Sequence, residues 1–103
     1  MAIFGKKAID NELEPPRIAT DGSKALELLR LWASTSGPHQ MVLKKGFDEP
    51  GVWGILLADV VRTAASVYAS EGMEFDVAFE RIQSVLTREL AAPSSPGENF
   101  VNE

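Results

Sequence analysis

The chain has 103 residues, enough for one domain, and its 45% hydrophobic and 24% charged residues are typical of a globular protein. Its net charge of −5 disfavours binding to nucleic acid or to an anionic membrane, and the basic pairs Lys6-Lys7 and Lys44-Lys45 are too few to form a basic patch. Because the chain has no cysteine, disulfide scaffolds, thiolate metal sites and a cysteine nucleophile are excluded.

Breaker residues and polar stretches divide the chain into three parts. Residues 1–22 carry scattered charges and Pro15-Pro16 without a sustained period, so we predict an irregular lead-in. Their first residues lack the apolar stretch of a secretory signal, and we expect a cytoplasmic protein. Residues 93–103 are rich in Pro, Ser and polar residues and are predicted to form a flexible tail. The remaining segment, 23–92, is predicted to be a single α+β domain.

The first element of this domain is ambiguous. Residues 26–33 contain strong helix formers, and Ser23 is placed to cap a short helix. However, only about ten residues precede the breaker sequence Ser-Thr-Ser-Gly-Pro, and the segment 39–45 that follows has the length of a strand. A strand needs a partner, so we predict an antiparallel hairpin of 26–33 and 39–45, with a helix as the alternative for the first segment.

A long helix is predicted from about residue 49 to residue 70. Asp48 is expected as the N-cap, Pro50 suits the first turn, and Gly72 is placed to end the helix. Its apolar arc spans roughly 180°, against ~100° for an ordinary surface helix. The arc comprises Trp53, Leu56, Leu57, Val60, Val61, Ala64, Val67 and Tyr68. The apolar run 52–61 contains Asp59 and is too short to span a bilayer, so no membrane association is expected.

A second helix is predicted to start between Glu74 and Asp76 and to end near Ala92, ahead of Pro93. Its apolar stripe is narrower than that of the first helix. It comprises Phe75, Ala78, Phe79, Ile82, Val85, Leu86 and Leu90. The predicted fold class is therefore α+β, in the order strand-strand-helix-helix, with two helices packed on a small antiparallel sheet of two or three strands.

Three segments carry a resemblance to a known family. The sequences ALELLRLW (25–32), HQMVLKKGF (39–47) and DEPGVWGILLADVVR (48–62) resemble a family of small, mainly proteobacterial proteins of unknown function. The resemblance covers most of residues 25–90. It implies one compact bacterial domain and assigns no catalytic or binding residue.

Known catalytic patterns are absent from the sequence, which has neither a glycine-rich phosphate loop nor a nucleophile elbow. His39 is the single histidine and is interpreted as a polar residue that opens a strand. Asp59 and Arg62 are interpreted as a solvated ion pair. The carboxylates near the helix starts are interpreted as caps and dipole partners rather than as a metal site. These carboxylates are Asp48, Glu49, Glu71, Glu74 and Asp76. We therefore predict no catalytic, cofactor-binding or metal residue and no cofactor.

Two functional hypotheses remain open. The first is a non-enzymatic protein that acts through an interaction surface, most simply as a homodimer, because the wide apolar arc exceeds what one small sheet can cover. The second is a small-molecule binding module or minor enzyme, with an apolar pocket near Trp32, Trp53 and Tyr68. The sequence identifies neither a ligand nor any other protein partner.

Overall fold

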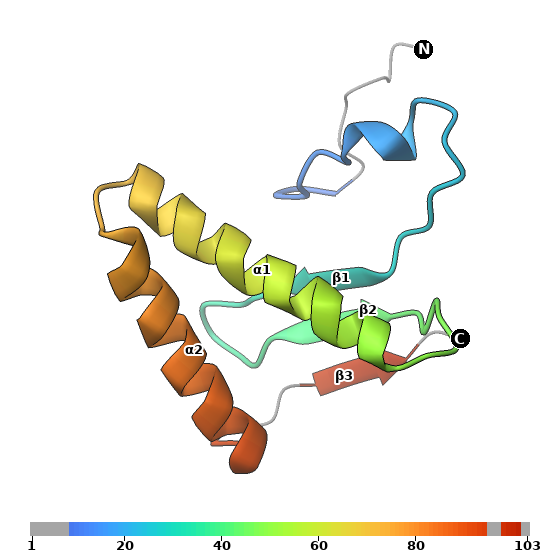
Figure 1. The fold of residues 1–103 in the computed structure, drawn as a ribbon. Helices are drawn as coiled ribbons and strands as arrows, with labels where there is room; N and C mark the ends of the chain where they lie inside the picture. Colours follow the sequence, from blue (N-terminus) through green and yellow to red (C-terminus); the bar gives the residue numbers. More distant parts are fainter. Residues whose placement is uncertain (1–8, 95–97, 102–103) are drawn as a thin grey trace.

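The fold was taken from a computed structural model, which describes residues 9–94 and 98–101. These residues form three strands, two α-helices and a short 3₁₀ helix, Arg17–Ala19 (Figure 1). The order strand-strand-helix-helix predicted for the central part of the chain is confirmed, and so is the α+β class.

The predicted hairpin is present. Strand β1, Leu29–Trp32, pairs antiparallel with strand β2, Gln40–Leu43. In this register Leu29 lies opposite Leu43, and Leu31 lies opposite Met41. The ambiguous first segment therefore contains a strand, because pairing with β2 overrides the helix propensity of its leucines.

A third strand lies in the segment where we expected only a flexible tail. Strand β3, Glu98–Val101, runs parallel to β2, and the sheet order is β1-β2-β3. A parallel neighbour needs a long crossover connection, which the two helices supply. The strand is four residues long and lies in a polar stretch rich in breakers, so no alternating pattern marked it in the sequence.

Helix α1, Gly51–Ser70, confirms the long predicted helix, but its start differs from the prediction. Pro50 already has helical backbone angles and is the N-cap residue, so Asp48 lies too far back to cap the helix. Instead, Glu49 Oε2 accepts a hydrogen bond of 2.8 Å from the amide of Gly51. Asp48 pairs with Lys45 at 3.5 Å.

Gly72 ends α1 as predicted. Its φ of +113° lies in a region that side-chain-bearing residues rarely adopt. The amide of Gly72 donates to the carbonyl of Ala69, and the amide of Met73 donates to the carbonyl of Tyr68. This pair of bonds is a Schellman motif, which satisfies carbonyls at the helix end and turns the chain toward α2.

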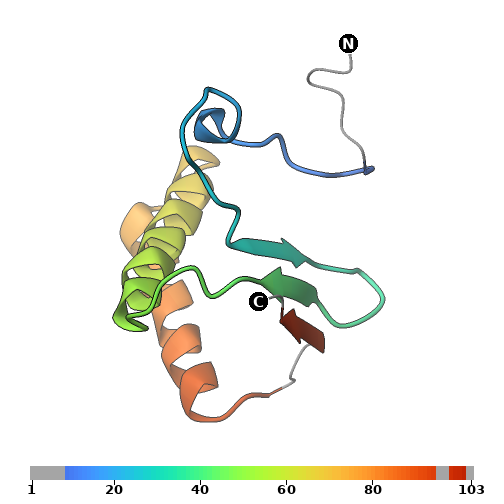
Figure 2. The same cartoon turned by 90° about the vertical axis from the view of Figure 1, so that its right-hand side faces the viewer.

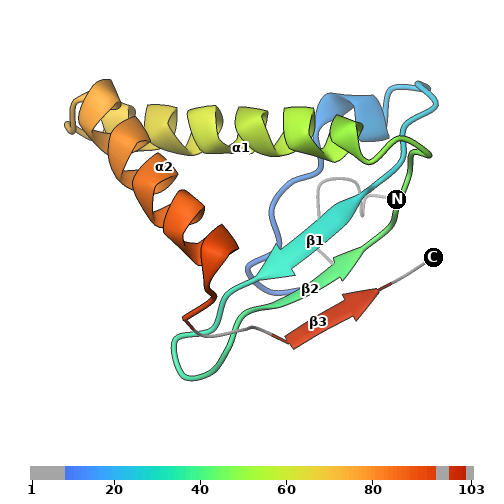
Figure 3. The ribbon, with the colours of Figure 1, turned by 60° about the horizontal axis from the view of Figure 1, so that its bottom comes forward.

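Helix α2, Phe75–Ala91, packs against α1, and the two diverge from the turn that joins them (Figure 3). Among the described residues, the buried hydrophobic core consists of Ala65 of α1 and Ala78 of α2. Two alanines from facing helices let the helix backbones approach closely at this point.

The helices and the sheet form two separate layers (Figure 2). Among the described residues, no strand Cα lies within 8 Å of a Cα in either α-helix. The two layers therefore make no close backbone contact within one chain.

The chain exposes more surface than a folded monomer of its size should. The accessible surface of all 103 residues, counted together with the thirteen outside the described ranges, is 8743 Å², whereas a monomer of 11.2 kDa is expected to expose roughly 5,700 Å². The radius of gyration is 16.0 Å, compared with about 13 Å for a compact domain of this length.

Candidate interaction surface

The apolar surface of α1 is the main feature that the fold leaves uncovered. On the helical wheel, α2 packs on the side that contains Ala65, and a neighbouring arc of roughly 100° remains open. We call this arc the open face of α1. It consists of Leu57, Val60, Ala64, Val67 and Tyr68. Its four large side chains are 48–56% exposed.

The charged residues of α1 lie away from this open face. Asp59 and Arg62 form an ion pair of 3.8 Å on the opposite side of the helix, and both side chains are largely exposed. Such a pair contributes ~0.3–0.5 kcal/mol, as expected for a solvated pair on a helix. The open face itself carries no charge over the 11 residue steps from Leu57 to Tyr68, or about 16 Å of helix.

Helix α1 is also long and apolar enough, by length and composition alone, to be considered a membrane span. It is the one helix of this kind among the described residues. Asp59 and Arg62 lie near its middle, where charged side chains are costly in a bilayer.

The sheet has a second apolar surface, which is partly exposed. Residues directly opposite one another in an antiparallel pair share a face, so Leu29, Leu31, Met41 and Leu43 lie on the same side of the sheet. We call this set the apolar sheet face. Leu31 is 56% exposed although it lies within a strand. Trp32, on the other side of the sheet, is also partly exposed.

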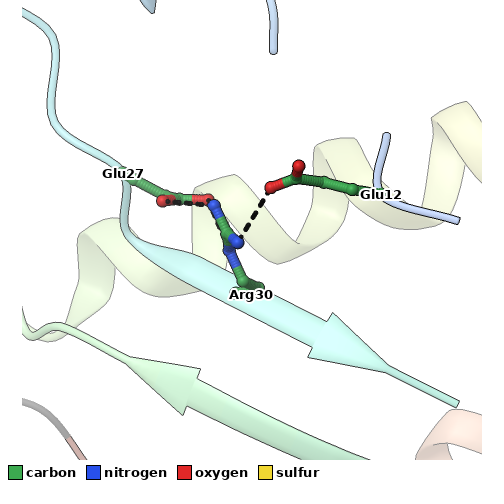
Figure 4. Close-up of polar contacts among 3 residues, drawn as sticks. All are labelled: Glu12, Glu27 and Arg30. Atoms are coloured by element: carbon green, nitrogen blue, oxygen red, sulfur yellow. Dashed lines mark hydrogen bonds and ion pairs between the residues drawn. The ribbon is translucent and has the colours of Figure 1, made fainter. Parts of the chain in front are cut away.

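An ion-pair cluster fixes the start of β1 (Figure 4). The Nε and Nη2 atoms of Arg30 donate to the two carboxylate oxygens of Glu27, at 3.2 and 3.1 Å. Arg30 Nη1 donates to Glu12 Oε2 at 3.0 Å. The hydrogen bonds to Glu27, together with its charge, raise the pKa of Arg30 above its ordinary value. Sequence analysis missed this cluster, because no local spacing relates Glu12 to a residue 18 positions away.

The residues singled out for chemistry do not converge on one site. His39 is exposed in the loop before β2. Glu71 is the C-cap of α1, Glu74 is the N-cap of α2 without a side-chain cap bond, and Asp76 lies in the first turn of α2. Within the described ranges, no three His, Cys, Asp or Glu side chains gather in a way that could hold a metal ion.

The three aromatic residues expected around a pocket are also dispersed. Trp53 donates through Nε1 to the carbonyl of Lys45 at 2.9 Å, which ties the first turn of α1 to the end of β2. Tyr68 lies 15 residues further along the same helix, or about 22 Å away. Trp32 lies on β1, outside the helix layer. One small ligand cannot span these positions.

Two open cavities occur among the described residues, and none of these aromatic residues lines either of them. The first, of about 250 Å³, lies at the start of β1 beside Arg30 and Lys44, with Leu29 and Val42 in its wall. The second, of about 390 Å³, lies along α1 at the border of the open face, between Val60 and Ala64 on one side and Asp59 and Thr63 on the other.

Comparison with known proteins places the chain in a family. A search of the curated proteins finds no match. A solved structure from the photosynthetic bacterium Rhodopseudomonas palustris, of a protein provisionally named a pyruvate dehydrogenase, is 30% identical with a TM-score of 0.67. The match covers 89% of this chain and 94% of that one. Residues 12–94 match a family described as a domain of unknown function, DUF5076, and the chain belongs to this family.

Proposed function

We propose that this protein is a non-enzymatic interaction protein whose working form is a homodimer. The observation that carries the proposal is the excess surface of a single chain, which is at most about 3,000 Å² beyond that of a compact monomer when all 103 residues are counted. Obligate dimers bury from about 2,000 to more than 5,000 Å² in total, counted over both partners. Burying most of the excess on each chain would thus create an interface of the obligate class.

The composition of the exposed surface also supports a partner. The open face of α1 and the apolar sheet face contain no charged residue, and a core depleted of charge is typical of homodimer interfaces. Isolated exposed apolar residues are common in monomers, but a continuous stripe along a helix is not. The net charge of −5 opposes association only weakly, because physiological salt screens charges beyond about 8 Å.

The core of one chain is small. Ala65 and Ala78 are the buried hydrophobic residues of the described part, and small domains without disulfides or metals need another source of stability. A second copy supplies that source, because it covers large side chains that one chain leaves about half exposed. Folding and association are therefore coupled in this proposal.

Sedimentation equilibrium over a range from micromolar to hundreds of micromolar tests the proposal. We expect a mass of twice 11.2 kDa throughout this range. A folded monomer of 11.2 kDa at the highest concentration would overturn it.

Co-sedimentation with zwitterionic lipid vesicles tests whether the apolar surface of α1 binds lipid. Recovery of the protein with the vesicles would mean that lipid, rather than a second copy, covers the open face.

The name of the Rhodopseudomonas protein favours a second candidate, the binding or conversion of a small carboxylate such as pyruvate. The cavity beside Arg30 and Lys44 is the place where such an anion would find cationic groups. However, three donor atoms of Arg30 already bind Glu27 and Glu12. We therefore expect millimolar pyruvate to leave the melting temperature unchanged. A concentration-dependent rise that is abolished by Lys44→Ala would favour this second candidate.

A further inference from the structure

The inference concerns how the two apolar surfaces are paired. The apolar sheet face consists of Leu29 and Leu31 on β1 with Met41 and Leu43 on β2. A strand of four residues is about 13 Å long. The open face of α1, about 16 Å long, therefore matches the sheet in length as well as in its lack of charge.

Each surface lacks the layer that it needs. A sheet with one apolar face is stable when a helical layer or another sheet covers that face, and an amphipathic helix needs a corresponding surface. Both kinds of layer are present in this chain, yet no helix Cα comes within 8 Å of the strands among the described residues (Figures 2 and 3).

Side-chain contacts hold the connection between β2 and α1. Trp53 Nε1 is bonded to the carbonyl of Lys45, and Lys45 pairs with Asp48. Gly46 has a φ of +75°, and a side chain at this position would collide with Leu28. The hydrogen bond and the ion pair place the start of α1 beside the end of β2.

We infer that the open face of α1 in one copy packs on the apolar sheet face of the other copy, and that the reverse contact is made at the same time. This inference rests on the proposed homodimer and specifies its interface. A twofold arrangement lets both copies bury the same two surfaces, so neither surface stays available to a third chain. Asp59 and Arg62 lie away from the contact and remain hydrated.

Cysteine cross-linking tests the arrangement without background from native thiols, because the chain has no cysteine. The double variant Leu31→Cys with Val60→Cys places one thiol on each surface, and a short bis-maleimide then joins thiols that lie close together. We expect most of the protein to migrate at twice 11.2 kDa on a denaturing gel. Tryptic peptides should show position 31 joined to position 60 of another chain.

Two matched controls accompany this variant. Leu31→Cys with Ser66→Cys moves the helix thiol to the polar side of α1 and should give no cross-linked dimer. Val60→Cys alone should also give none, because the two copies of α1 do not face each other in this arrangement. Sedimentation of each unlinked variant shows whether it still forms the dimer.

Each other result overturns the inference in a recognisable way. A 31–60 link within one chain would mean that the helices close on their own sheet. Efficient linking of the Val60→Cys variant alone would mean that α1 packs on α1. A dimer by sedimentation with no 31–60 link would reject this interface while leaving the homodimer intact. A monomer by sedimentation would reject both the interface and the proposed function.

Discussion

Arg30 Nη1 and Glu12 Oε2 lie 3.0 Å apart and join the segment before the domain to the first strand of the sheet (Figure 4). The Glu12 side chain is 22% exposed and that of Arg30 is 40% exposed, so water screens the contact only in part. The other side of the Arg30 guanidinium is held by Glu27. The ion pair therefore fixes the position of residues near Glu12, which no regular secondary structure holds.

Replacing Glu12 with Gln should loosen this segment. We expect only a small loss of stability, because water screens the ion pair in part. Trypsin should cleave the variant after Arg17 faster than the parent protein. Added salt should speed cleavage of the parent for the same reason. Glu14→Gln, at an exposed position two residues away, is the control, and equal cleavage rates for both variants would contradict the role of the pair.

Val60→Asp should disrupt the dimer. Val60 is 56% exposed in one chain, so an aspartate there would be hydrated in a monomer. In the proposed dimer the same carboxylate would be buried without a partner, at a cost of several kcal/mol. We expect monomeric mass and a lower melting temperature. Ser66→Asp, on the polar side of α1, is the control and should change neither property. An unchanged dimer for Val60→Asp would place the interface elsewhere.

Truncation after Ser94 should destabilise the protein, because it removes β3 and leaves β2 without its parallel neighbour. Each net hydrogen bond contributes about 1 kcal/mol, and a loss of 1 kcal/mol lowers the melting temperature of a domain of this size by about 4–8 °C. Differential scanning calorimetry should thus show a decrease of several degrees. Truncation after Val101 keeps β3 and serves as the control. Identical midpoints for the two truncations would mean that β3 adds nothing to stability.

The connection after α2 should depend on pH. The amide of Ser94 donates to Glu89 Oε1 at 2.9 Å, and this hydrogen bond lowers the pKa of Glu89 below 4.5. A carboxyl group whose pKa is lowered in the folded state stabilises that state at pH values above the pKa of the same group in the unfolded chain. This contribution is lost as the pH falls through the folded pKa, so the change lies below pH 4.5.

The chemical shift of the Ser94 amide proton, followed by NMR, measures this effect. We expect a constant value above pH 5 and a shift toward the free-amide value as Glu89 is protonated. Glu89→Gln keeps an acceptor oxygen but does not titrate, so its Ser94 signal should stay constant. A parent titration centred above 4.5 would show that the hydrogen bond does not persist in solution.

The sequence by itself determined the elements whose causes are local. The helix from Gly51 to Ser70 follows from a long apolar arc and from a glycine at the position that needs a positive φ. The second helix follows from its amphipathic period, and the hairpin from two short apolar segments around a Gly-Pro loop. The width of the apolar arc on the first helix also indicated a partner before any geometry was known.

The tertiary structure decided what depends on residues far apart in the chain. The pairing of β3 with β2 brings residue 100 beside residue 42, and the contact of Arg30 with Glu12 spans 18 positions. The periodicity of the sequence does not predict such contacts. They form where a strand has a free edge or where a guanidinium has donors that local residues do not use. The separation of the helix layer from the sheet is likewise a property of the whole chain. It leaves Leu31 of the sheet and the open face of α1 exposed.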